Sequence, residues 1–256
     1  MGKSYLAMSL IVAAAAMAGV QMPARAAEVH VITTGAIKAA LDALAPMYEK
    51  SSGDKLILQY ESSVPEREKL EGGASFDLAI GAAALMNSLA DKGLAAKGTL
   101  STLGALAAEV AYHHGDPAPD VSTPEALKAL VLKAKSISYS DPALGGTSSV
   151  YFAGVIQTMG IADEVRRKAI MTKPGQGAAP VGEGKAEIGV AQSSEIAMVP
   201  GLDGVPLFPA DPKSKSTLAM AVSSKAGNAA GAAAFEKYLV SPEATAVLRA
   251  KGVLAN

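Results

Sequence analysis

Near its start the chain reads Val29-His30-Val31-Ile32-Thr33-Thr34-Gly35-Ala36, and the rest of the sequence repeats the pattern that begins here. Residues 29–33 are rich in β-branched side chains, which predicts a short strand. From residue 36 to residue 50 apolar side chains recur at helical spacing, which predicts an amphipathic helix. A strand that leads directly into a helix is the unit from which parallel sheets are built.

The same alternation continues to the end of the chain. Short apolar runs predict further strands at residues 56–60, 77–80, 108–112, 137–140, 188–191 and 218–222. Helical spacing or a serine or threonine cap before proline predicts helices that begin near Pro65, Ala83, Pro124, Val150, Gly231 and Pro242. We therefore predict an α/β fold in which mostly parallel sheets are flanked by helices.

The composition excludes several classes of protein. The 256 residues are half apolar and carry 24 acidic and 23 basic side chains, so the chain is long enough for one large domain or two small lobes. The balanced charge provides no basic surface, and we expect no nucleic-acid partner. The absence of cysteine excludes disulfides and thiolate catalysis, and three histidines leave little for a metal site. We expect neither a metal nor a cofactor.

Residues 1–26 have the pattern of a secretory signal peptide. Lys3 gives a positive start, residues 6–20 are uncharged, and Ala24-Arg25-Ala26 has the small-x-small pattern of a cleavage site. The alternative is a membrane anchor, but a span needs about 20 apolar residues and this run is shorter. Because the chain has no cysteine to carry a lipid, we expect a mature protein that is free in the periplasm and not lipid-anchored.

Hydroxyl groups and glycines gather where predicted strands end. The turns are Thr33-Thr34-Gly35-Ala36, Glu61-Ser62-Ser63 and Gly145-Gly146-Thr147-Ser148-Ser149. In an open parallel sheet, ligands bind beyond the carboxyl ends of the strands, beside helix N-termini with unpaired N–H groups. For each turn taken alone, helix capping is the favoured explanation. Together the turns predict a site for an oxyanion or a carboxylate.

Two charged features near the predicted elements have more than one interpretation. With Pro65 as the first helical residue, Arg67 falls in the first helical turn, where the helix dipole disfavours a cation. A ligand carboxylate would explain this position, and an ion pair with Glu71 is the alternative. His113-His114 is interpreted as the solvated end of a strand rather than as a metal site, because no carboxylate stands at a ligand spacing.

In the order and spacing of its motifs the chain resembles the periplasmic molybdate-type substrate-binding proteins of ABC transporters, which have the two-lobed type II binding fold. The resemblance covers nearly the whole mature chain. The segments that carry it are Thr33-Thr34-Gly35-Ala36, Ser62-Ser63, Phe76-Asp77-Leu78-Ala79-Ile80-Gly81, Ser140-Asp141-Pro142, Gly184-Lys185-Ala186-Glu187-Ile188-Gly189 and Ser241-Pro242-Glu243-Ala244.

This resemblance implies an architecture and a set of partners. Residues 27–108 and 213–256 would form the first lobe and residues 109–212 the second, with the ligand in the cleft between them. The chain would cross between the lobes near residues 107–112 and 210–216. The resemblance also implies a small anionic ligand, a monomer, and an inner-membrane ABC permease that receives the ligand.

The family pattern also implies which residues hold the ligand. Family members use a serine after each of the first two strands, backbone N–H groups of the second lobe, and a tyrosine. Ser63 keeps the second serine, whereas Ala36 and Gln192 occupy the positions of the first serine and the tyrosine. We therefore expect an organic di- or tricarboxylic acid rather than molybdate. The predicted ligand residues are Thr33, Thr34, Gly35, Ala36, Ser62, Ser63, Arg67, Gly81, Gly146, Thr147, Ser148 and Gln192.

A subgroup of this family includes a periplasmic isomerase that acts on the tricarboxylate aconitate. This resemblance rests on residues 184–189 and on Met198-Val199-Pro200-Gly201. A cofactor-free aconitate isomerase is therefore the alternative to a binding protein, and a secreted interaction module ranks third because only 4% of residues are aromatic. Isomerisation needs a base beside a C–H bond. Asp141 is the first candidate, with capping of its own turn as the simpler role, and Glu195, Glu61 or a histidine follow.

Overall fold

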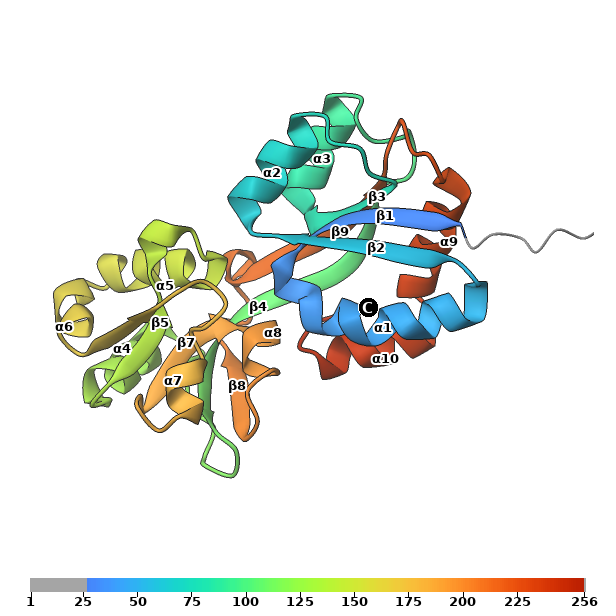
Figure 1. Cartoon of the computed structure of the whole chain (residues 1–256). Coiled ribbons are helices and arrows are strands. Elements are labelled where there is room, and N and C mark those ends of the chain that lie inside the picture. Colours follow the sequence, from blue (N-terminus) through green and yellow to red (C-terminus); the bar gives the residue numbers. More distant parts are fainter. Residues whose placement is uncertain (1–26, 256) are drawn as a thin grey trace, which may run out of the picture.

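The computed structural model describes residues 27–255, which form two groups of strands and helices joined by long strands (Figure 1). The predicted signal peptide of residues 1–26 lies outside the described residues. The strands make one sheet in the order β2-β1-β3-β9-β4-β7-β5-β6, with β8 paired to β4.

Three parallel strands begin the first group, with β1 (Glu28–Thr34) between β2 (Lys55–Glu61) and β3 (Leu78–Ala82). Val29 and Val31 of β1 face one core and Ile32 faces another, because successive side chains of a strand point to opposite sides. Helix α1 (Lys38–Ser52) covers the first of these faces. Helices α2 (Ser63–Glu71) and α3 (Ala83–Asp91) cover the other (Figure 1).

The long strand β4 (Ser101–His113) belongs to both groups. Its residues 101–107 pair with β9 (Lys215–Val222), and its residues 108–113 pair with β7 (Ile188–Gln192) and β8 (Leu202–Pro206). Strand β9 also pairs with β3, so the chain returns to the first group after residue 214. Helices α9 (Ala229–Leu239) and α10 (Pro242–Ala250) then join α1 on the same core. The division into lobes at residues 108/109 and 212/213 remains our proposal.

The second group is built in the same way. Strand β5 (Ile137–Ser140) lies parallel between β6 (Ala169–Thr172) and β7. Tyr139 and Phe152 meet edge to face in its core, with ring centroids 5.2 Å apart. The helices of this group are α4 (Pro124–Lys133), α5 (Thr147–Thr158), α6 (Ala162–Arg167), α7 (Ala179–Gly182) and α8 (Ser193–Ile196).

The predicted α/β class is confirmed, and the sheet has a mixed rather than a mostly parallel character. Strands β2-β1-β3 and β7-β5-β6 are parallel, whereas β9 and β4 run antiparallel to their neighbours. Sequence patterns missed β6, β8 and the short helices α6, α7 and α8. These strands have mostly half-buried side chains, and a helix of four to six residues is too short for an apolar period to show.

Helix α2 begins two residues earlier than predicted, at Ser63. This start turns Glu66 into the interior, where its side chain faces Gly81 of β3. A Cβ atom at Gly81 would lie 2.2 Å from Glu66 Oε1, so the glycine leaves the space that the carboxyl group occupies. Gly81, which we predicted to bind the ligand, therefore has a packing role. Oε1 of Glu66 has no hydrogen-bond partner among the described residues.

Burial makes Glu66 a source of pH-dependent stability. Burial, and then the nearby charge of Glu61, raise the pKa of Glu66 from 4.5 to about 8. Below about pH 4.5 both the folded and the unfolded chain hold this proton. As the pH rises towards 8 the unfolded chain releases it first, and stability falls by up to about 1.4 kcal/mol per pH unit from this group.

We predict that Glu66→Gln removes this contribution, so that its free energy of unfolding declines less than that of the wild type between pH 5 and pH 8. Urea denaturation at several pH values measures the difference. Glu68→Gln, an exposed position on the same helix, serves as the control and should follow the wild type. Parallel curves for Glu66→Gln and the wild type would contradict the prediction.

Candidate functional site

A cavity of about 580 Å³ lies between the two groups of strands, at the carboxyl ends of β1, β2 and β7. Both groups contribute to its lining. From the first group come residues 34–36, Lys38, Tyr60 and residues 61–65. From the second group come residues 144–147, 174–175, Gln192, Ser194, Glu195 and Met198. The position agrees with the rule that ligands of open α/β sheets bind beyond the carboxyl ends of the strands.

Most of the predicted ligand residues come together in this lining. They are Thr34, Gly35, Ala36, Ser62, Ser63, Gly146, Thr147 and Gln192. These residues come from four segments between positions 34 and 192, and the fold brings these segments to one cavity. Their contact with a ligand remains a prediction.

The other predicted ligand residues do not line the cavity. Thr33 is fully buried within β1, and Ser148 is buried in the first turn of α5. Arg67 lies in the second turn of α2, because the helix starts at Ser63 rather than Pro65. Its guanidinium binds Glu71 at 2.9 Å. The ion pair that we considered as the alternative for Arg67 is therefore the arrangement observed.

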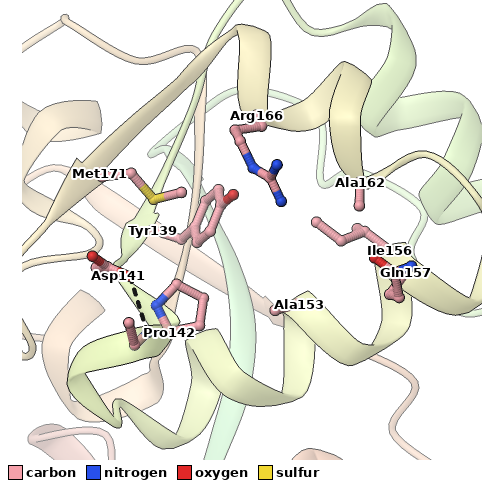
Figure 2. Close-up of a pocket in the computed structure, with 10 residues that line it drawn as sticks. Tyr139, Asp141, Pro142, Ala153, Ile156, Gln157, Ala162, Arg166 and Met171 are labelled. Carbon is pink, nitrogen blue, oxygen red and sulfur yellow. Dashed lines mark hydrogen bonds between the residues drawn. The ribbon is translucent and has the colours of Figure 1, made fainter.

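Asp141 lies in a different place from the one its proposed role requires. Its carboxylate accepts a hydrogen bond from the backbone N–H of Ala143 at 2.9 Å and caps the short 3-10 helix Pro142–Leu144. It lines a separate pocket of about 300 Å³ with Tyr139 and Arg166 (Figure 2). The capping role explains Asp141, and we withdraw it as the candidate base for the larger cavity.

Two helix N-termini present backbone N–H groups to the cavity without a side-chain cap. Ser62 precedes α2 and its side chain accepts no hydrogen bond from the helix, and Gly146, which precedes α5, has no side chain to do so. The first N–H groups of a helix have no partner within the helix, and they carry the positive end of its dipole. The arrangement can offer an anion N–H donors from both groups of strands.

Lys38 adds a cation to the lining and was not predicted from the sequence. Its ammonium lies 2.7 Å from Asp42 and 4.3 Å from the centroid of the Tyr60 ring. The Tyr60 hydroxyl donates to Asp42 at 2.6 Å. Hydrogen bonds from Lys38 and Tyr60 lower the pKa of Asp42. Asp42 thus holds both neighbours in position from the next turn of α1.

Helix α8 contributes a hydroxyl group and a carboxyl group. Ser194 is buried, and its Oγ has no hydrogen-bond partner among the described residues. Glu195 accepts a hydrogen bond from the N–H of Gly177 at 3.2 Å. Burial raises the pKa of Glu195 to about 7, while backbone N–H groups of Gly177, Gln192 and Gly175 oppose the increase. With a pKa of about 7, the protonated and ionised forms of this carboxyl group are both populated near neutral pH.

Glu61, the other carboxyl group of the lining, is held in its ionised state. Lys69 binds it, and Gln59 donates to it at 3.0 Å. The hydrogen bond from Lys69 is the main cause of the lowered pKa of Glu61. A group that stays ionised is a weak base, so Glu195 is the carboxyl group of this lining that is suited to accept a proton near neutral pH.

Ser193 fixes helix α8 against the rest of the molecule. Its hydroxyl donates to the carbonyl oxygen of Gly252 at 2.6 Å and accepts from the N–H of Ala107 at 3.2 Å. A Cβ atom at Gly252 would lie 2.3 Å from the carbonyl oxygen of Ser193, and its φ of 77° also favours glycine. The C-terminal segment therefore packs directly against the helix that carries Ser194 and Glu195.

Residues 27–255 contain neither a metal-binding cluster nor a membrane-spanning helix. In this part of the chain no group of three or more histidine and acidic side chains is placed to hold a metal ion. His114 instead lies 2.9 Å from Asp203, at the exposed end of β4. No helix in this part combines the length and the apolar character that crossing a membrane requires.

A family model and a curated relative both match nearly the whole described chain. Residues 29–254 match the family of bacterial extracellular solute-binding proteins. An aconitate isomerase from Pseudomonas sp is 31% identical over 231 residues, which cover 87% of this chain and 86% of that protein.

Solved structures share the fold. A substrate-binding domain assigned to a molybdenum ABC transporter of Clostridium difficile superposes with a TM-score of 0.71 at 21% identity, covering 90% of this chain and 100% of that chain. The periplasmic molybdate-binding protein of Azotobacter vinelandii gives a TM-score of 0.66 at 18% identity, covering 89% and 99%. These similarities confirm the predicted two-lobed binding-protein fold.

The two neighbouring serines of α8 should differ in their effect on stability. Ser193→Ala removes a donor and an acceptor, which leaves Gly252 and Ala107 without their partner, and should lower the free energy of unfolding by about 1–3 kcal/mol. Ser194→Ala removes a buried hydroxyl without a protein partner and should leave it unchanged or raise it. Urea denaturation measures both, and equal losses would contradict the assignment.

Proposed function

Because the chain belongs to the family of bacterial extracellular solute-binding proteins, we propose that its cavity captures a small organic anion, a di- or tricarboxylate. The observation that carries this proposal is the pair of uncapped helix N-termini, from α2 and α5, that line the same cavity from opposite sides. Lys38, which is paired with Asp42, adds an ammonium group to the first side. Donors on both walls would hold an anion and draw the two groups of strands together.

The size and lining of the cavity favour a carbon skeleton over a tetrahedral oxyanion. A volume of about 580 Å³ lies in the range of sites for small organic molecules. Tyr60, Val64, Leu144 and Met198 contribute apolar surface between the polar groups. Ala36 and Gln192, which stand where the molybdate-type pattern has hydroxyl donors, remove two contacts that a small oxyanion would need.

The family also suggests where the protein acts and what it serves. We propose that the mature chain is periplasmic, works as a monomer without a cofactor, and delivers its ligand to an inner-membrane ABC permease. The support comes from the family match and from structural neighbours that are described as transporter or periplasmic binding proteins.

We predict that a polycarboxylate stabilises the protein and that molybdate and sulfate do so less. A ligand at about 1,000 times its dissociation constant adds roughly 4 kcal/mol to the free energy of unfolding. For a chain of this size the melting temperature should rise by roughly 8–16 °C. A thermal-shift screen with molybdate, sulfate, citrate, tricarballylate and both aconitate isomers measures this, and a shift with molybdate alone would refute the organic-acid proposal.

Two variants locate this binding. Ser63→Ala should weaken it about 10- to 150-fold, because a hydrogen bond to a charged group contributes about 1.5–3 kcal/mol. Arg67→Gln is the control and should bind as the wild type does, since Arg67 is paired with Glu71 outside the cavity. Normal affinity in Ser63→Ala, or a loss in Arg67→Gln, would show that the site is misplaced.

Aconitate isomerisation is the second candidate function. Two observations favour it, the 31% identity to an aconitate isomerase and the presence of Glu195 in the cavity. Moving the double bond of aconitate takes a proton from its methylene carbon and returns a proton to the former vinyl carbon. An ionised Glu195 could accept this proton and give it back, while the N–H donors of α2 and α5 stabilise the negative charge that develops.

For this second candidate we predict conversion of trans-aconitate to cis-aconitate, with deuterium entering from deuterated water, followed by proton NMR. Glu195→Gln should abolish the conversion, and Asp141→Asn should retain it, because Asp141 lines a separate pocket. Tight binding without conversion or deuterium entry would leave a transport receptor. Turnover that survives in Glu195→Gln would exclude Glu195 as the base.

A further inference from the structure

The two walls of the cavity differ in what they offer a ligand. The wall from the first group presents Lys38 and the uncapped N-terminus of α2, which suit a fully ionised carboxylate. The wall made by α8 presents Ser194 and Glu195. An ionised Glu195 would repel an anion, so this wall binds a second carboxylate only if Glu195 carries a proton.

We propose that Ser194 and Glu195 form a subsite that holds a carboxylate of the ligand through a proton on Glu195, so that capture of a polycarboxylate takes up one proton from solution. The inference rests on the proposed capture of an organic anion. The proton comes from solvent and stays on the Glu195 carboxyl group, which donates it in a hydrogen bond. No bond of the ligand is broken.

The geometry of Ser194 supports a ligand subsite. Ser194 is one of the residues that line the cavity, it is 4% exposed, and its Oγ is buried without a partner among the described residues. Buried hydroxyl groups are almost always hydrogen-bonded. A ligand carboxylate beside α8 would supply the missing acceptor.

Among residues 27–255, no cation lies beside Glu195 that would keep it ionised. The N–H of Gly177 binds its carboxyl group at 3.2 Å, the N–H groups of Gln192 and Gly175 also lower its pKa, and no charged side chain contributes to the shift. Helix α8 packs against β4, which carries Glu109, and β8, which carries Asp203. Lys173 at the adjoining loop is exposed, and Lys38 across the cavity binds Asp42.

Electrostatic repulsion determines whether anion binding takes up or releases a proton at Glu195. Two neighbouring carboxylates that no cation neutralises disfavour each other's charge in a water-poor site, so one of them takes up a proton. Glu195 is the group whose protonation requires least free energy, because burial already raises its pKa to about 7. A bound anion raises this pKa further, so binding consumes a proton at and above neutral pH.

Titration calorimetry with tricarballylate and with trans-aconitate from pH 6 to pH 9 tests the inference, using zwitterionic buffers that differ in ionisation enthalpy. Tricarballylate has no double bond and so cannot be isomerised. The wild type should take up close to one proton at about pH 8. Its affinity should fall by up to about tenfold per pH unit above pH 7.

Glu195→Gln should bind without proton uptake and without a fall in affinity above pH 7. It should keep its affinity at pH 9, because the amide imitates the protonated carboxyl group as a donor. Ser194→Ala should bind more weakly at every pH with the slope unchanged. Glu109→Gln is the matched control, since burial also raises the pKa of Glu109 to about 7 and it does not line the cavity. Its pH slope should equal that of the wild type.

Each remaining outcome has a definite meaning. Binding of either acid without proton uptake, or an unchanged slope in Glu195→Gln, overturns the inference and leaves the proposed capture intact. If neither acid binds at any pH, the proposed capture fails and the inference fails with it.

Discussion

The backbone hydrogen bonds of strand β4 hold the two halves of the molecule together. Residues 101–107 pair with β9 in one half, and residues 108–113 pair with β7 and β8 in the other. The chain returns from the second half to the first just before β9, which pairs with β4, so the position of the two cavity walls depends on how these strands lie. Ser193 adds to this constraint, since its hydroxyl joins β4 at Ala107 to the C-terminal segment at Gly252. A change in the angle between the halves would therefore bend β4 or alter the hydrogen bonds of Ser193.

Three buried glutamates without basic partners share one structural solution. Glu66 faces Gly81, Glu109 faces Gly204, and Glu195 lies beside Gly177. Gly81 and Gly204 leave the space that the carboxyl groups of Glu66 and Glu109 occupy, whereas Gly177 binds Glu195 through its N–H. Burial raises the pKa of all three acids. Glu66 and Glu109 lie outside the cavity lining. Glu195 lies within it, so its protonation is available to a ligand.

The sequence predicted the parts of this molecule that depend on local order. Strands followed by helices are recognisable from periods of two and 3.6 residues, and hydroxyl-rich turns mark the strand ends of the cavity. The predictions that differ from the structure concern exact helix starts and side-chain positions, which the local sequence pattern does not determine. Helix α2 starts two residues before the predicted position, and Arg67 lies outside the cavity lining. The carboxylate of Asp141 caps its own turn. Lys38 and Ser194 lie on elements whose orientation depends on tertiary packing, and no local pattern distinguishes them from solvent-exposed or core residues.

The two candidate functions make opposite demands on Glu195. A receptor benefits when this carboxyl group is protonated, because the proton removes repulsion and adds a hydrogen bond to the bound anion. An isomerase needs the ionised form, because only a carboxylate can accept a proton from carbon. Since a bound anion raises the pKa of Glu195, an enzyme would bind best at low pH and turn over fastest at high pH. A receptor would show only the first of these dependences, so the pH profile of Glu195 distinguishes the two functions on one and the same fold.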